Sequence, residues 1–243
     1  MGSATGDNEL TWLLEAYDVH RPIPGDRPWL LLDMVSSVDG RIALGGRVGA
    51  LSTPPDKALF HHLRGLADAV LVGAQTVRSE NYGAVRSEPA AAERRASRNQ
   101  APDARLCIVS RSLELDPTAR VFDEGGPLPV VFTCESSPPE RRERLAQVAH
   151  VEVIGDSSVD LTAAMQMLRA WGSELVVCEG GAVINSELVD NGLVDELCLT
   201  VSPVLGGDPL GLLATRPHET RHLDLAWSHS VGGTVFLRYL LSR

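Results

Sequence analysis

The chain has 243 residues, 44% of them hydrophobic, and its 32 acidic and 22 basic side chains give a formal net charge of −10 at pH 7. This length can enclose one large core, and the even recurrence of apolar segments favours a single domain. An acidic balance without a basic face argues against nucleic-acid binding, and no apolar run approaches the ~20 residues of a membrane span. Residues 1–7 are polar and show no signal peptide, so we expect a frayed start and a cytoplasmic protein.

The cysteines and one histidine pattern bear on metal binding. Each cysteine lies in an apolar, strand-like run, no two are close enough for a metal knuckle, and buried free thiols are the simplest expectation. The four are Cys107, Cys134, Cys178 and Cys198. Residues 218–222 match the HExxH zinc pattern, but Pro217 precedes them and residues 223–227 alternate like a strand. We therefore expect no metal.

The N-terminal part predicts one helix and one buried strand. Apolar residues within 9–18 have the spacing of a short amphipathic helix. Three prolines make the next segment a loop, so we take 1–28 as an extension before a single domain over 29–243. The run 29–36 is typical of a central strand. Asp33 interrupts it, and a carboxylate there must find a partner or face a cleft.

A glycine-rich loop over 44–52 follows, and then a helix. Thr53 is placed to cap this helix, proline occupies its first turn, and Arg64 lies near its end. A second buried strand at 68–73 leads at once into another helix. Apolar bulk then disappears from 84 to 104, which predicts a solvated excursion between elements.

The rest of the chain repeats this alternation. Strands are expected at 105–109, 129–133, 151–154, 174–178 and 194–201, and helices at 137–149, 160–172 and 182–190. Residues 222–227 and 232–240 alternate in polarity around a Gly232-Gly233 turn, which indicates a closing antiparallel hairpin.

This order of elements predicts an α/β fold of three layers, a mostly parallel central sheet flanked by helices, with the antiparallel hairpin at its C-terminal end. Sites in such sheets lie at the carboxyl ends of the strands. Five strands end at small or polar residues, which are Ser36, Gly73, Ser110, Thr133 and Glu179. Their convergence indicates a nucleotide-type site at that edge.

The strand that ends at Glu179 is followed by two glycines and a helix. Unpaired N–H groups and the positive end of the helix dipole would surround one point there, and glycine lets a pyrophosphate approach the backbone closely. The glycines can equally serve turn geometry alone. Gly206-Gly207 is open to the same two interpretations, a tight turn or part of a site.

Two arginines have both a structural and a binding interpretation. Arg111 stands between two serines just after a strand, where it is either solvated or part of a 2′-phosphate pocket, which needs a permanent cation and short hydroxyl donors. Arg64 either extends its guanidinium to solvent from an apolar helix or, beside a cleft, clamps a substrate phosphate.

Four linked segments together resemble the reductase domain of bacterial riboflavin biosynthesis, the RibD C-terminal family. They are SSVDGRIA at 36–43, LRGLADAVLVGAQTV at 63–77, EGG at 179–181 and VDEL at 194–197, in the family's order. The resemblance implies a dihydrofolate-reductase-like fold, NADPH as cofactor and a homodimer. It also implies reduction of the ribosyl group of a phosphorylated aminopyrimidine to a ribityl group.

The same resemblance implies roles for individual residues. Ser36 and Ala50 would line the nicotinamide side, Ser110 or Arg111 the adenosine end. Further cofactor contacts would come from Thr76, Glu80, Gly180, Gly181, Ala182, Val183, Ile184 and Asn185. Substrate contacts would come from Arg64, Arg86 and Glu179. The chain departs from the family at Asp33, where lysine is frequent, and at Glu80-Asn81-Tyr82, where aspartate and Asp-Pro are usual.

The sequence thus predicts an NADPH-dependent oxidoreductase of riboflavin biosynthesis that reduces the sugar carbon of its substrate in the ring-opened imine form. Glu179 and Asp33 are the expected catalytic residues, and the enzyme mainly orients donor and acceptor. A second interpretation keeps fold and cofactor but changes the acceptor to a pterin or another carbonyl compound, because an acidic Asp33 suits an N-heterocycle. A third is a nucleotide-binding sensor without catalysis.

Overall fold

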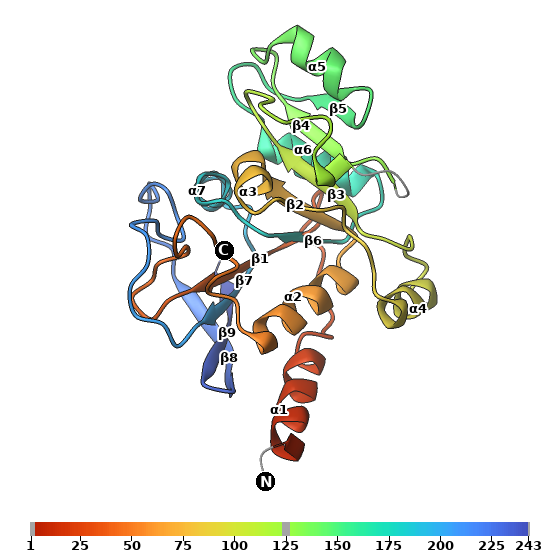
Figure 1. The fold of residues 1–243 in the computed structure, drawn as a ribbon. Helices are drawn as coiled ribbons and strands as arrows, with labels where there is room; N and C mark the ends of the chain where they lie inside the picture. The colour runs from red at the N-terminus through yellow and green to blue at the C-terminus, as the bar shows by residue number, and fades with distance from the viewer. Residues whose placement is uncertain (1–2, 123–126, 243) are drawn as a thin grey trace.

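The computed structural model describes residues 3–122 and 127–242. Its centre is a nine-stranded sheet in the order β5-β4-β3-β2-β6-β1-β7-β9-β8 (Figure 1). The strands are β1 (Trp29–Ser36), β2 (Ala69–Gly73), β3 (Arg105–Val109), β4 (Val130–Thr133), β5 (His150–Val153), β6 (Leu175–Cys178), β7 (Glu196–Val201), β8 (Leu223–Val231) and β9 (Thr234–Leu241). The helices are α1 (Ser3–Glu15), α2 (Pro54–Leu66), α3 (Ala74–Ser79), α4 (Pro89–Ser97), α5 (Pro139–Leu145), α6 (Leu161–Ala170) and α7 (Ala182–Asp190), with a 3₁₀ turn at η1 (Arg120–Phe122).

Strand β1 lies in the middle of the parallel part of the sheet, as its apolar run predicts. It pairs in parallel with β6 on one side and β7 on the other. Neighbouring pairs from β5 through to β7 are all parallel, so their carboxyl ends meet at one edge. Only β9 and β8 add antiparallel pairs to the described sheet, and the predicted mostly parallel architecture is confirmed.

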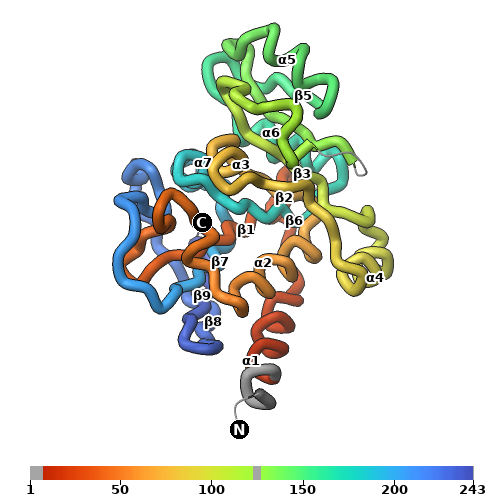
Figure 2. Tube along the Cα trace, in the orientation of Figure 1, coloured from red at the N-terminus to blue at the C-terminus, as the bar shows by residue number. Residues whose placement is uncertain are grey.

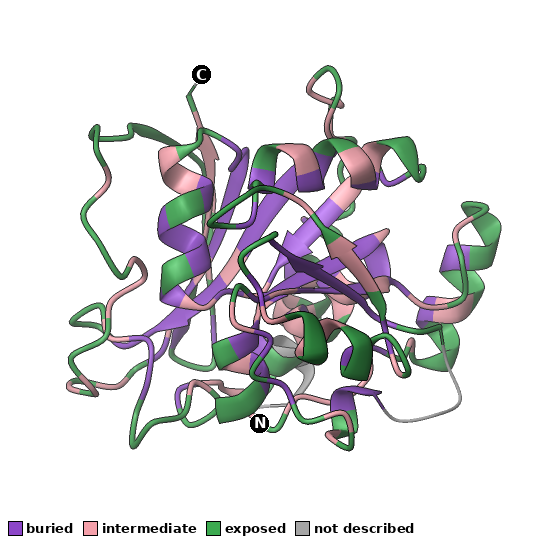
Figure 3. Ribbon diagram, turned by 90° about the horizontal axis from the view of Figure 1, so that it is seen from above, coloured by how far each residue is buried: buried purple, intermediate pink, exposed green. Residues whose placement is uncertain are grey.

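Helices cover both faces of the sheet, which gives the three expected layers. One apolar core packs α1, α2, α3 and α5 against one face, and a second packs α6 and α7 against the other. Buried residues are concentrated in the sheet and on the helix surfaces turned towards it (Figure 3). Alternate residues of β1 divide between the cores: Leu31 contributes to the first, and Leu32 to the second. Asp33 therefore lies on the face that α2 covers.

The C-terminal hairpin is confirmed, with Gly232 and Gly233 as a two-residue turn. Their φ angles are 58° and 83°. A type I′ turn requires positive φ at both central residues, and only glycine adopts this without strain, so the glycine pair sets the register of β8 and β9.

The N-terminal segment joins the main core and is not a frayed end over the described residues. Helix α1 begins at Ser3, so residues 3–7 are helical where we expected a frayed start, while residues 1–2 lie outside the described part. Leu13 and Tyr17 are completely buried. The trace in Figure 2 brings α1 beside α2 and the C-terminal strands, in agreement with its packing against α2 and β8.

Residues 84–104 are not wholly a solvated excursion, because they contain α4. This helix packs on α2, and its Arg95 is only 1% exposed. The Arg95 guanidinium donates to the carbonyls of Ala67 at 2.5 Å and Gly65 at 3.3 Å, which satisfies the C-terminal end of α2. Burial lowers the pKa of Arg95. This polar, arginine-rich stretch is therefore anchored to the fold, because its Arg95 caps the C-terminal end of α2.

Three local predictions are also settled by the structure. Thr53 occupies the N-cap position of α2 but makes no capping hydrogen bond, because its hydroxyl accepts from Thr234 at 3.0 Å. Residues 218–222 form no helix, and the strand β8 follows directly at Leu223. The four cysteines are buried free thiols, as expected.

Candidate functional site

A cavity of about 600 Å³ opens at the carboxyl ends of β1 and β6. It lies among α2, the N-terminal ends of α3 and α7, and the loop that follows β1. The residues that carry its chemistry are Asp33, Ser52, Asp56, Lys57, Arg64, Thr76, Glu80, Tyr82, Glu179, Gly181, Ala182 and Val183. This is the edge at which parallel sheets place their sites.

An ion pair between Arg64 and Glu179 lies in the cavity wall. Arg64 Nε donates to Glu179 Oε1 at 2.6 Å and Arg64 Nη2 donates to Oε2 at 2.7 Å. The side chains are only 14% and 4% exposed, so solvent screens this pair weakly. Tyr82 completes the cluster: its hydroxyl donates to Glu179 and accepts from Arg64. We call these three residues the Arg64 cluster.

Two aromatic rings hold the Arg64 guanidinium in place. Its centre lies 4.1 Å from the centroid of the Phe60 ring and 5.1 Å from that of Tyr82. Although burial disfavours the charged form, Glu179 and Tyr82 raise the pKa of Arg64 above its usual range. Burial and the neighbouring Glu179 likewise raise the pKa of Tyr82, so its hydroxyl stays protonated. The cluster is a fixed cation–carboxylate pair with a hydroxyl donor beside it.

Two further carboxyl groups, Asp33 and Asp56, line the same cavity. Asp33 comes from β1, and its neighbour on β7 is Cys198. Asp56 comes from the first turn of α2 and accepts a hydrogen bond from Ser52 Oγ at 2.5 Å. Within the described residues, neither carboxyl has an Arg, Lys or His nitrogen within the 4.0 Å of an ion pair.

Burial raises the pKa of Asp33 well above its ordinary 3.8, and the charges of Asp56 and Glu179 raise it further. Burial also raises the pKa of Asp56, which the neighbouring hydroxyls of Ser52 and Thr200 partly offset. Of the two alternatives expected for a carboxylate inside β1, a partner or a cleft, the structure shows the cleft. We call Asp33 and Asp56 the acidic wall of the cavity. Their raised pKa values favour the protonated carboxyl groups.

The glycine pair after Glu179 has two different environments. Gly180 has φ of 82°, which favours glycine, and a Cβ there would lie 2.9 Å from Met34 Sδ, so the flexible Met34 side chain would have to shift. Gly181 has φ of 65° and precedes α7, whose first residues Ala182 and Val183 line the cavity. A Cβ on Gly181 would lie 3.0 Å from Thr76 Oγ1. A helix N-terminus, a hydroxyl and a residue without a side chain thus meet at one end of the cavity, a set of donors that fits a pyrophosphate.

The loop after β1 is held over the cavity by Glu80, at the C-terminal end of α3. Glu80 Oε1 accepts from the backbone N–H of Val48 at 2.8 Å. At the other side of this loop, Gly46 N–H donates to Asp208 Oδ2 at 2.6 Å. Gly207 beyond it has φ of 139°, and its Cβ would lie 2.7 Å from the carbonyl of Ala43. Close backbone approach therefore requires glycine at 207, while Gly206 has open space around it and is favoured only by its φ of 99°. The neighbouring Asp208 lines the cavity.

The structure brings together about half of the site residues that the sequence singled out. Those in the cavity wall are Asp33, Arg64, Thr76, Glu80, Glu179, Gly181, Ala182 and Val183. Those that do not line it are Ser36, Ala50, Arg86, Ser110, Arg111, Gly180, Ile184 and Asn185. Their roles stay predictions.

Several of these positions show why local sequence is a poor guide. Ser110 is buried, and its Oγ accepts from the N–H of Leu113 at 3.0 Å, so it closes a turn. Arg111 is exposed, and its charge acts on the carboxylate of Glu187 in α7. Arg86 is exposed and pairs with Asp103 at 3.5 Å.

The remaining positions belong mainly to the protein interior. Asn185 is fully buried, and its Nδ2 donates to the carbonyl of Leu212 at 2.9 Å. Ser36 and Ile184 are also buried. Ala50 is exposed beside the lining residue Gly49.

Sequence reasoning missed several residues of the wall. They are Ser52, Asp56, Lys57, Phe60, His61 and Tyr82. Five of them lie in or just before α2. Leu59 and Leu63 of this helix are buried in the core, and Phe60 and Arg64, which are also four positions apart, share a neighbouring helix face that borders the cavity. Tyr82 was marked only as a departure from the family pattern.

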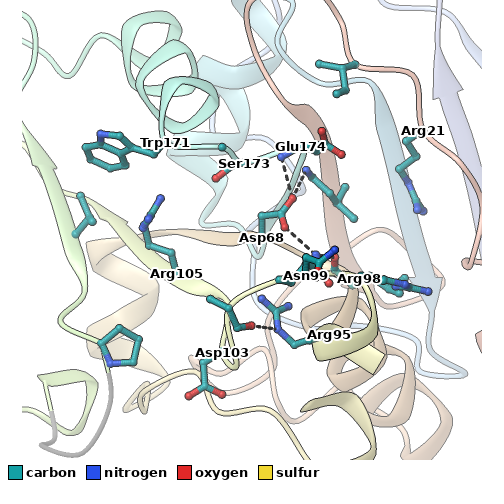
Figure 4. Close-up of a pocket in the computed structure, with 18 of the residues that line it drawn as sticks. Arg21, Asp68, Arg95, Arg98, Asn99, Asp103, Arg105, Trp171, Ser173 and Glu174 are labelled. Carbon is teal, nitrogen blue, oxygen red and sulfur yellow. Dashed lines mark hydrogen bonds between the residues drawn. The ribbon is translucent and has the colours of Figure 1, made fainter. Parts of the chain in front are cut away.

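A second cavity of about 1350 Å³ lies at the opposite edge, where β2, β3 and β6 begin (Figure 4). At its centre the carboxylate of Asp68 accepts from the N–H groups of Glu174 at 2.8 Å and Leu175 at 3.0 Å. Arg105 lies over the ring of Trp171, 5.0 Å from its centroid. These groups join strand starts to one another, so the polar contacts there are structural.

The described residues contain no helix long and apolar enough to cross a membrane. Within the same residues, no group of three or more His, Cys, Asp or Glu side chains is arranged to hold a metal ion.

A parallel sheet with a C-terminal antiparallel hairpin and a carboxyl-edge cavity defines a dihydrofolate-reductase-like α/β protein. Solved structures share this fold. A pyrimidine reductase-like protein from Corynebacterium diphtheriae matches with a TM-score of 0.82 and 28% identity, over 89% of this chain and 92% of that one. A riboflavin biosynthesis reductase of Saccharomyces cerevisiae matches with a TM-score of 0.67, over 98% and 99%, and at 20% identity it shows the fold alone.

The chain belongs to the RibD C-terminal domain family, whose model matches residues 28–237. Among its relatives is the 2,5-diamino-6-ribosylamino-4(3H)-pyrimidinone 5′-phosphate reductase of Methanothermobacter thermautotrophicus. That protein is 30% identical over 219 residues, which are 88% of this chain and 98% of the relative. The resemblance drawn from four short segments is thereby confirmed.

Proposed function

We propose that this protein is an NADPH-dependent reductase that converts the ribosylamino group of a phosphorylated ribosylaminopyrimidine to the ribitylamino form in riboflavin biosynthesis. The observation that carries the proposal is the full-length relationship to a reductase named for such a substrate. A cavity that combines a helix N-terminus with carboxyl groups and a fixed arginine supports it. The reaction places the enzyme among oxidoreductases that act on a CH–OH or imine carbon.

The cofactor would lie with its pyrophosphate at the start of α7. Gly181, Ala182 and Thr76 supply free backbone N–H groups, space and a hydroxyl there. NADPH would supply hydride to the acceptor carbon. The roles implied for Ser36, Ala50, Ser110 and Arg111 need contacts beyond the cavity wall, and they remain part of the proposal.

The acceptor would lie against the acidic wall and the Arg64 cluster. Glu179 Oε2 accepts from both Arg64 and Tyr82, whereas Oε1 has a lone pair left after its bond to Arg64, so Oε1 can accept from a pyrimidine amino or ring N–H. Because two hydrogen bonds from Arg64 fix the orientation of the Glu179 side chain, the acceptor meets a preorganised group. The family resemblance assigns Arg64 and Arg86 to the substrate. The substrate phosphate would lie nearest to the cavity mouth, where the exposed side chains of Lys57 and His61 add nitrogen groups.

Steady-state oxidation of NADPH with two acceptors tests the proposal. Turnover with a phosphorylated ribosylaminopyrimidine, and none with a dihydropterin, is the expected result. The reverse preference would establish the alternative, a reductase of the same fold acting on a pterin-like or other acceptor, which the acidic Asp33 favours. Binding of NADPH with oxidation by neither acceptor would indicate a sensor. Glu179→Gln should lower turnover strongly and leave NADPH affinity nearly unchanged.

Two further properties belong to the same proposal. The family resemblance implies a homodimer, which light scattering on the purified chain tests directly. Buried free thiols are typical of proteins kept in a reducing compartment, which supports a cytoplasmic location.

A further inference from the structure

The Asp33 and Asp56 carboxyl groups form a site that the family resemblance does not assign as a pair. Both line the cavity and come from adjacent layers, Asp33 from strand β1 and Asp56 from helix α2, which covers that face of the sheet. Asp56 is 8% exposed. Arg64, a cation in the same cavity wall, is already bound through two nitrogen atoms to Glu179. Two carboxyl groups in one cavity wall without a cation partner cannot both ionise at low cost.

The surroundings of the pair contain few groups that could offset its charge. Those that interact with one of the two carboxyl groups or share the cavity wall with them are Tyr17 after α1, Ser52 before α2, Lys57, His61 and Arg64 on α2, Glu179 after β6, and Cys198 and Thr200 on β7. Tyr17 and Cys198 are bonded to each other at 2.6 Å, and burial raises the pKa of both. Lys57 is exposed, and Ser52 gives Asp56 a single neutral hydrogen bond. The region therefore favours one bound proton over two negative charges.

We propose that Asp33 holds a proton and presents it to the acceptor nitrogen, and that Asp56, a second carboxyl group of the same cavity wall, is the positioning residue that keeps the proton there at neutral pH. This inference rests on the proposed function. For each hydride that the acceptor carbon receives, the C=N nitrogen gains one proton and the C=N bond becomes C–N. The pair supplies that proton and recovers it from water at the cavity mouth, so one hydride and one proton are consumed per turnover.

The pH dependence of kcat/KM tests the pair, because Asp56→Asn and Ser52→Ala should shift the midpoint of the profile in opposite directions. In the wild type kcat/KM falls as the pair loses its proton. Asp56→Asn removes the like charge, so the fall should begin about one pH unit or more lower, with a roughly tenfold loss at neutral pH and near-normal activity at acidic pH. Ser52→Ala removes a hydrogen bond to the charged form, so its fall should begin at higher pH. Asp33→Asn should be slow at every pH.

Asp208→Asn is the matched control, because Asp208 is a carboxylate of the same cavity that is bonded to a backbone N–H. Its profile should keep the wild-type midpoint. An Asp56→Asn profile scaled by one constant factor across all pH values, with no shift of its midpoint, would overturn the pair. So would an Asp33→Asn variant with wild-type rates.

Unfolding measured on the protein alone separates failure of the pair from failure of the proposed function. Groups with raised pKa values bind more protons in the folded state, so the unfolding free energy falls as pH rises above their ordinary 3.8 and through the folded values. Asp56→Asn should reduce this fall and be at least as stable as the wild type at neutral pH. An unchanged pH slope would refute the effect of Asp56 on the Asp33 proton even if the enzyme turns over. A reduced slope without any turnover would leave the pair standing and reject the proposed acceptor.

Discussion

Glu179→Gln should destabilise the fold, because it leaves the Arg64 guanidinium buried without a counter-charge. The side chains are 14% and 4% exposed, and they are joined by contacts of 2.6 Å and 2.7 Å. Breaking a buried pair by removing one partner costs about 3–5 kcal/mol. Since Gln can keep a hydrogen bond to Arg64 or Tyr82, we expect the lower end, about 3 kcal/mol.

Equilibrium unfolding in urea measures this cost, and a double-mutant cycle identifies its source. Arg64→Met leaves Glu179 as the unpaired charge and should also cost about 3 kcal/mol. In the double variant no charge is left unpaired, so its loss should fall short of the sum of the single losses by about 2 kcal/mol.

Glu174→Gln is the control, since that carboxylate is 65% exposed and lies 3.8 Å from Arg169. Its effect should stay within about 0.5 kcal/mol. A Glu179→Gln variant as stable as this control, with additive double-variant energies, would refute the argument that a buried ion pair builds the cavity wall.

Three other substitutions test separate parts of the structure. Gly181→Val places a branched side chain at φ of 65° against Thr76, and should weaken NADPH binding by about tenfold or more in calorimetry; unchanged affinity would remove this glycine from the cofactor site. Arg95→Met leaves the carbonyls of Gly65 and Ala67 unpaired, and should lower the unfolding free energy by about 2–3 kcal/mol; a neutral result would reject its capping role. Leu13→Ala should cost about 2–5 kcal/mol in the same assay, and a negligible cost would mean that α1 is dispensable.

The layers and the edge that carries the site are predictable from local pattern. Apolar runs such as 29–36 identify strands, and the alternation with helices sets their parallel order and the common edge of their carboxyl ends. The Gly232-Gly233 turn fixes the hairpin, because few residues tolerate its backbone angles. These signals lie within a few residues of the feature that they predict.

The partners of buried charges are not predictable in this way. Arg64 and Glu179 are 115 positions apart, and Arg95 reaches carbonyls about 30 positions away, so no local spacing reveals either contact. Asp56 looks like an ordinary acidic residue in the first turn of a helix until the fold places it in the same cavity wall as Asp33. Ser110 is the opposite case, a residue that the sequence favours for the site and the fold uses elsewhere. It follows a strand at the correct edge, yet its hydroxyl accepts from the N–H of Leu113 and closes a turn.

A crystal structure with bound NADPH tests most directly whether the carboxyl-edge cavity is the catalytic site. The account predicts the nicotinamide ring in the cavity of about 600 Å³, with C4 towards the acidic wall and the pyrophosphate at the start of α7. Cofactor bound instead in the cavity of about 1350 Å³ at the amino ends of the strands would contradict it.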